Sequence, residues 1–172
     1  MTLQEVLAAR NGLEAEKKII QYCDYLVTAM NHEDYMNFGN ITAENPAKKA
    51  FKDINEEDYE SDYFEMINAN QRHTRCTQHG CLRKKKNGRG QECRYGFPFE
   101  KIEDSCIEYQ AKKTNDQTIY YVIKYFPKRN DSLLNSHNRV MSVGWRGNID
   151  LQIVLDEKRA RLYATKYAAK GE

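Results

Sequence analysis

One short segment concentrates the side chains that bind transition metals. Residues 71–98 hold three of the five cysteines and two of the four histidines in the pattern H-x2-C-x4-C-x11-C. The expected ligands are His73, Cys76, Cys81 and Cys93, with His79 as an alternative nitrogen ligand. Zinc prefers four nitrogen and sulfur ligands in a tetrahedron, and two short-spaced pairs joined by a loop can supply them. The pattern therefore predicts a structural zinc site; the alternative is a basic loop with free cysteines.

The same segment is the most basic part of the chain. It carries 8 basic and 1 acidic side chains, whereas residues 1–70 carry 6 basic and 14 acidic ones. Such a cluster is the electrostatic footprint of a nucleic-acid contact, although a charge run can also be only a solvated loop. We expect its cations to contact phosphates. The residues concerned are Arg83, Lys84, Lys85, Lys86, Arg89 and Arg94.

Two tyrosines near the end of the sequence could form a pair of nucleophiles. Residues 159–170 contain no Gly or Pro and are rich in Ala, which predicts a helix on which residues four apart share a face. Tyr163 and Tyr167 would then stack, with Arg159, Lys166 and Lys170 around them. The remaining face is small and apolar and is expected to pack on a sheet; it comprises Leu155, Ala160, Leu162, Ala164 and Ala168. Alternatively, the two rings only anchor the helix.

The other elements follow from hydrophobic periodicity. Apolar residues at helical spacing predict helices over 13–31, with Cys23 in the core, and over 56–70. Residues 31–46 read as a loop in which His32 is solvated. Residues 99–118 are weakly patterned, and 118–126 is β-branched and aromatic, hence a strand. Residues 139–143 and 148–154 are predicted to form a hairpin whose polar face, with His137, could line a site, although a half-buried sheet explains the alternation equally well.

These elements make an α+β fold with N-terminal helices, a zinc-stapled basic loop, a small antiparallel sheet and a C-terminal tyrosine-bearing helix. At 172 residues the chain suits one domain with a small satellite. Its segments are an acidic helical part (1–70), the basic zinc part (71–98) and an α+β part (99–172), of which 71–172 should form one unit. Without an 18-residue apolar run or a signal peptide, no membrane contact and an intracellular location are expected.

Three blocks, in this order, give the chain a family resemblance. They are residues 73–98 with their Cys-Arg-Tyr-Gly-Phe-Pro ending, residues 133–138 followed by Gly-Trp-Arg-Gly-Asn-Ile-Asp at 144–150, and Tyr-x-x-Lys-Tyr-x-x-Lys-Gly-Glu at 163–172. Together they resemble the replication-initiator (Rep) region of Helitron transposon proteins, which precedes a helicase domain. The resemblance covers residues 71–172, and the first 70 residues are only loosely similar.

The resemblance implies a DNA-nicking and strand-transfer activity in rolling-circle transposition, and hence a nuclear location. In that family, paired tyrosines cleave single-stranded DNA and stay joined to its 5′-phosphate, a role that would fall on Tyr163 and Tyr167. A phenol has a reference pKa of about 10, and nearby cations such as Lys166 and Lys170 favour the phenolate. Arg146, in the second block, and Arg159 complete the expected DNA contacts.

One departure limits this expectation. In the family, a His-hydrophobic-His strand upstream of the cysteines binds the divalent metal that polarises the scissile phosphate. The four histidines of this sequence, at 32, 73, 79 and 137, form no such pair. The chain is therefore expected to be a fragment or degenerate copy, inactive alone, that would need Mg²⁺ or Mn²⁺ only once the missing half is supplied. The alternative is a catalytically silent, zinc-supported nucleic-acid-binding or structural module.

Overall fold

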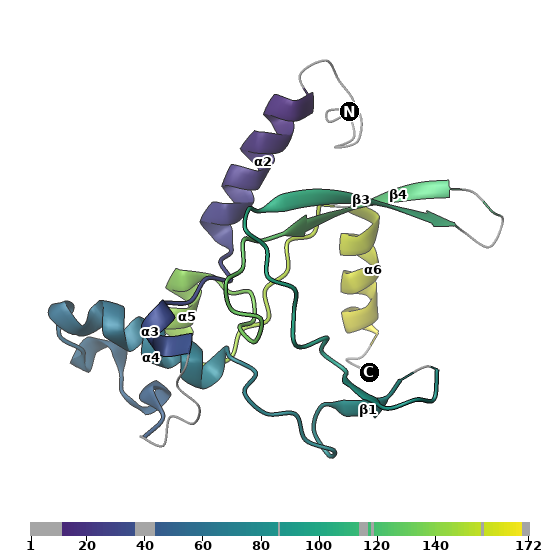
Figure 1. Ribbon diagram of the computed structural model, residues 1–172. Coiled ribbons are helices and arrows are strands. Elements are labelled where there is room, and N and C mark those ends of the chain that lie inside the picture. The colour runs from purple at the N-terminus through teal and green to yellow at the C-terminus, as the bar shows by residue number, and fades with distance from the viewer. Residues whose placement is uncertain are drawn as a thin grey trace. The chain divides into compact units, whose positions relative to one another are not determined.

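Two compact units make up the part of the chain that the computed structural model describes (Figure 1). The described residues are 12–36, 44–85, 87–113, 117, 119–155 and 157–169, with backbone only at 120, 121, 157–159, 166 and 167. The first unit draws on Met1–Leu26, Asp104–Pro127 and Gln152–Glu172, and the second on Val27–Glu103 and Lys128–Leu151. Helices together with two small antiparallel sheets confirm the predicted α+β class.

These units cut across the segments read from the sequence, and residues 71–172 do not form a single unit. The cause is backbone pairing over long separations. Thr28 and His137 exchange two backbone hydrogen bonds, of 2.8 and 2.9 Å, and Arg72 forms an isolated bridge with Leu134. Residues 128–151 therefore belong with residues 27–103, which no change in local composition indicates.

The first unit contains helix α2 (Gly12–Leu26), strands β3 (Cys106–Lys113) and β4 (Ile119–Phe126), and helix α6 (Glu157–Ala168). Strand β4 and the two helices were predicted. Strand β3 was not, because its sequence is polar and only Ile107 is buried. It forms because β4 offers an antiparallel partner along its whole length, from Cys106 opposite Phe126 to Lys113 opposite Ile119.

Helix α2 is tied to this hairpin by side chains at its C-terminal end. Cys23 is only 1% exposed, which confirms the predicted core position. The adjacent Asp24 accepts hydrogen bonds through Oδ1 from Ser105 Oγ at 2.5 Å and Tyr125 OH at 2.6 Å. The helix ends at Leu26, earlier than its periodicity suggests, because Thr28 and Ala29 enter β-bridges of the second unit.

The second unit is built on helix α4 (Tyr59–Asn70), whose buried face supplies most of the apolar core. That core comprises Tyr63, Met66, Ile67 and Leu134. The remaining elements are α3 (Glu33–Met36), α5 (Arg139–Trp145), three 3-10 turns (Pro46–Lys48, Phe51–Asp53 and Glu56–Asp58) and a hairpin of β1 (Leu82–Lys84) and β2 (Gln91–Cys93).

The predicted hairpin over residues 139–154 is wrong. Residues 139–145 form helix α5, because the Asn138 side chain caps it by accepting from Met141 N at 2.9 Å. Arg146, in the left-handed region at φ 55°, ends it. Residues 148–155 alternate between exposed and half-buried positions as expected, yet they form no strand, since no described strand pairs with their backbone.

Candidate metal centre

The structure gathers the four predicted ligands into one cluster. The Sγ atoms of Cys76, Cys81 and Cys93 and a ring nitrogen of His73 all lie within 4.8 Å of one another. His73 Nε2 is 3.0 Å from Cys76 Sγ, 3.5 Å from Cys81 Sγ and 3.6 Å from Cys93 Sγ. Bonds of about 2.3 Å to sulfur and 2.0 Å to nitrogen in a tetrahedron would hold N and S about 3.5 Å apart. The cluster can therefore hold a metal ion such as zinc.

Local backbone structure brings the three sulfur atoms together. After Cys76, the carbonyl of Thr77 accepts from the N–H groups of Gly80, Cys81 and Leu82, at 3.0 to 3.2 Å, so the chain turns back on itself. In the β1–β2 hairpin, Cys93 lies opposite Leu82, next to Cys81 in sequence. A turn thus brings Cys76 close to Cys81, and the β1–β2 hairpin brings Cys93 close to Cys81. His79 is exposed and lies outside the cluster.

A second turn favours the thiolate of Cys93. Gly96 donates to the Cys93 carbonyl at 2.9 Å and has φ +85°, a conformation that suits glycine. Burial acts to raise the pKa of the Cys93 thiol, but hydrogen bonds from the backbone of Tyr95 and Phe97 and from the Cys76 and Cys81 side chains together outweigh it, so the pKa is lowered. A buried sulfur with such donors is suited to metal ligation.

Cys76 shows why this cluster favours a cation. Hydrogen bonding with the Cys81 thiol is the main cause that raises the pKa of Cys76 to about 12, and negative charge on its neighbours acts in the same direction. Three thiolates this close repel one another. A divalent ion held by the three sulfurs would offset this repulsion and favour their deprotonated form.

His73 connects the cluster to the rest of the second unit. Its backbone N–H donates to Leu133 O at 2.7 Å, and its ring stacks on Phe97 with centroids 4.6 Å apart. Phe97 packs against Phe99 at 4.3 Å, and Phe99 lies under the Arg129 guanidinium at 4.5 Å. A metal ion here would therefore hold the hairpin and the loop around residue 133 together.

The predicted phosphate contacts lie mostly on the β1–β2 hairpin and are largely exposed. Lys84, Lys85 and Arg89 are exposed, and Lys86 lies outside the described residues. Arg83 pairs across the hairpin with Glu92 at 3.1 Å. Among the described residues this is the hairpin's only ion pair, so its surface keeps a net positive charge.

The prediction that Arg146 contacts nucleic acid is wrong. Its residue surface is only 7% exposed, and its two terminal nitrogens donate to the two carboxylate oxygens of Asp62 at 2.7 and 2.8 Å. One of these nitrogens also donates to Pro46 O at 2.6 Å. Arg146 thus joins α4, α5 and the first 3-10 turn. Because Asp62 neutralises its buried guanidinium, this group is not placed to bind a phosphate.

The tyrosine pair lies on α6, as predicted. Positions 163 and 167 are one turn apart within the helix, and Tyr163 is 63% exposed. For three predicted site residues of α6 the structure describes the backbone but not the side chain, and Lys170 lies outside the described residues. The three are Arg159, Lys166 and Tyr167.

The prediction that the small apolar face of α6 packs on a sheet is wrong. Leu162 is 62% exposed, and Ala160, Ala164 and Ala168 are exposed as well. Every α6 residue whose side chain is described is exposed, because the helix is rich in small and charged residues and offers little apolar area for burial.

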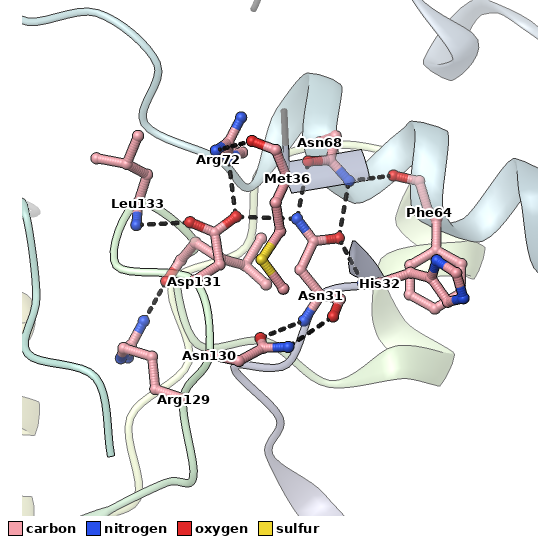
Figure 2. A network of polar contacts seen from close by, with 11 residues as sticks. Asn31, His32, Met36, Phe64, Asn68, Arg72, Arg129, Asn130, Asp131 and Leu133 are labelled. Atoms are coloured by element: carbon pink, nitrogen blue, oxygen red, sulfur yellow. Dashed lines mark hydrogen bonds and ion pairs between the residues drawn. The ribbon is translucent and has the colours of Figure 1, made fainter. Parts of the chain in front are cut away.

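A buried polar network in the second unit escaped the sequence analysis (Figure 2). Asn31 lies between Asn68 and Asp131, and its Nδ2 donates to both at 2.9 Å, while Asn68 Nδ2 returns a bond of 3.0 Å. Asp131 also accepts from Arg72 Nε at 2.8 Å. The network joins helix α4, through Asn68, to the polar stretches around Asn31 and Asp131, and no local sequence pattern indicates that these residues meet.

Two of the histidines outside the cluster, His137 and His32, contact aromatic side chains of the second unit. His137 is fully buried, with Nε2 2.8 Å from Tyr63 OH and Nδ1 3.0 Å from Asn135 O. Burial lowers the pKa of His137. It therefore belongs to the core and does not line the predicted site. The His32 side chain is 52% exposed, which agrees with the predicted solvated position, and its ring also packs against Phe64.

Comparison with known proteins adds no relative. No protein-family model matches the chain, and neither a curated protein nor a solved structure matches it significantly. Within the described residues, no helix combines the length and apolar character needed to cross a membrane.

Proposed function

We propose that this chain is the C-terminal part of a Helitron-type Rep domain that binds single-stranded DNA and supplies two tyrosine nucleophiles. The proposal rests on the three sequence blocks given above and on one structural observation. That observation is the cluster of three thiols and one imidazole at the foot of a hairpin with exposed cations. A metal-supported basic hairpin is a rigid surface for a phosphate backbone.

Zinc is the metal that this donor set favours. His73, Cys76, Cys81 and Cys93 would hold it, and it would contribute folding free energy while leaving no open coordination position for chemistry. The purified chain should contain one zinc per molecule, and Cys81→Ser should lose it. Cys106→Ser is the matched control, because Cys106 is outside the cluster. A folded wild-type chain without metal would contradict this part of the proposal.

DNA binding is expected to be electrostatic and sequence-tolerant. Lys84, Lys85 and Arg89 are exposed on the hairpin and make no ion pair among the described residues. Each phosphate contact on single-stranded DNA contributes about −0.7 to the slope of log affinity against log salt. Lys84→Gln plus Lys85→Gln should therefore reduce the slope by up to about 1.4 in a titration with a labelled oligonucleotide.

In the nicking step, the phenolate oxygen of Tyr163 or Tyr167 attacks phosphorus. The bond from phosphorus to the 3′-oxygen breaks, and that oxygen takes up a proton to become a free 3′-hydroxyl. The DNA 5′-phosphate stays on the tyrosine, so the hydroxyl can reverse the step without ATP. The exposure of Tyr163, and the position of Tyr167 one turn later, would let the pair reach an extended strand.

This step needs a divalent ion on the scissile phosphate, for which the chain lacks a His-hydrophobic-His pair. We expect a covalent adduct with an oligonucleotide and Mg²⁺ or Mn²⁺ only when a segment carrying that pair is added. Tyr163→Phe plus Tyr167→Phe should abolish the adduct while leaving DNA affinity unchanged. An adduct that survives the double change would assign the nucleophile elsewhere.

The second candidate is a catalytically silent, zinc-supported nucleic-acid-binding or structural module. It is favoured by the surroundings of the histidines, since His73 belongs to the sulfur cluster and His137 is buried against Tyr63. DNA binding without any adduct, even with the added segment, would favour this module over the nicking domain.

A further inference from the structure

An exposed aromatic ring stands on the turn that carries one of the metal ligands. Tyr95 comes two residues after Cys93 and is 54% exposed. Its ring meets His73 edge-on, with centroids 6.3 Å apart and planes at 69°. This contact leaves more than half of the residue in solvent, so core packing does not account for a large aromatic side chain here.

The neighbouring cation lies against this ring. The Arg94 guanidinium carbon is 4.6 Å from the Tyr95 centroid, and a terminal nitrogen donates to the Tyr95 hydroxyl. Arg94 is exposed, and none of the carboxylates in the described residues forms an ion pair with it. A guanidinium has five N–H donors in a planar fork, so most remain available for a phosphate while the ring keeps the group oriented.

Backbone bonds attach this pair to the foot of the basic hairpin. Arg94 N donates to Cys81 O at 2.7 Å, which extends the β1–β2 pairing by one residue beyond Cys93. Exposed Lys84 and Lys85 follow along the same hairpin. A DNA strand that follows these cations would meet an aromatic ring beside the metal ligands.

We propose that Arg94 and Tyr95 form a nucleotide-contact site for single-stranded DNA, in which Tyr95 stacks on a base and Arg94 donates to a phosphate. The inference rests on the proposed DNA binding and adds a base contact to it. Single-stranded DNA is favoured over a duplex because stacking needs an unpaired base face, whereas a duplex presents mainly phosphates to a side chain. The metal matters because Cys93 fixes the turn on which both residues stand.

The test compares Tyr95→Ala, Tyr95→Phe and Arg94→Gln in fluorescence anisotropy with a labelled oligothymidine and with a duplex of equal length. Loss of one stacked base should weaken binding of Tyr95→Ala to the oligothymidine about 5- to 150-fold, with little change for the duplex. Tyr95→Phe should bind like wild type, because the ring is kept. Arg94→Gln should lower the salt slope by about 0.7.

Two controls separate a contact from a folding effect. Tyr25→Ala removes another exposed tyrosine, 84% exposed on α2, and should not change binding. Zinc content and circular dichroism of Tyr95→Ala should equal those of wild type. A Tyr95→Ala chain that loses zinc and weakens both DNA forms equally would show a structural role and overturn the inference.

The remaining outcomes also distinguish the two proposals. If Tyr95→Ala binds oligothymidine like wild type while Lys84→Gln plus Lys85→Gln weakens it, this inference fails and the proposed DNA binding stands. If the zinc-loaded wild-type chain binds no oligonucleotide at low salt, both fail.

Discussion

Arg146 offers the sharpest test of structure against sequence, since its sequence context suggested a DNA contact and its surroundings indicate a buried ion pair. Arg146→Met removes the guanidinium and leaves the Asp62 carboxylate buried without its partner. The side chains of the pair are only 7% and 11% exposed, and two direct hydrogen bonds join them. Water therefore cannot readily replace the lost contacts.

The expected loss of stability follows from those bonds. Each hydrogen bond to a charged group contributes about 1.5–3 kcal/mol, and breaking a buried ion pair from one side costs about 3–5 kcal/mol. We expect Arg146→Met to lower the free energy of unfolding by about 3–5 kcal/mol, a large part of the 5–15 kcal/mol typical of a domain. Arg146→Lys keeps the charge but loses the bidentate geometry, and should lose about 1.5–3 kcal/mol.

Urea titrations followed by far-UV circular dichroism measure this loss. Arg83→Met is the matched control, because it breaks the exposed pair with Glu92 and should change stability by about 1 kcal/mol or less. DNA affinity of Arg146→Met, measured at a temperature where the chain is folded, should equal that of wild type. Unchanged stability together with a reduced salt slope would refute the buried-pair argument and restore the sequence interpretation.

Four further predictions concern the apolar core, the surface of α6, the buried polar network and pH. Leu134→Ala should lower stability by about 2–5 kcal/mol in urea titrations, whereas Leu162→Ala on exposed α6 should change it by less than about 0.5 kcal/mol. Asn31→Ala leaves Asp131 and Asn68 short of buried partners and should lower the thermal midpoint by an amount equivalent to about 1–3 kcal/mol. Burial holds the pKa of His137 below its unfolded value near 6.5, so its contribution is complete above that pH and is lost as pH falls toward the folded pKa. Stability should thus fall by up to about 1.4 kcal/mol per pH unit below 6.5, and His137→Gln should flatten that part of the profile.

The sequence alone determined the features that depend on neighbours a few residues apart. Helical periodicity predicted α2 and α4, an Ala-rich run without Gly or Pro predicted α6, and a β-branched aromatic run predicted β4. Each of these signals comes from residues close together in sequence. The metal cluster was also predictable. Its four ligands lie within 21 residues, so one turn and one hairpin suffice to bring them together.

Tertiary structure decided the features that depend on distant partners. Strand β3 forms on a polar sequence because β4 pairs with it along its whole length. Nothing in the sequence around Arg146 distinguishes it from an exposed cation, because its partner Asp62 is 84 residues away. In each case the residue type permits two states, and the free energy of contacts made across the chain selects between them.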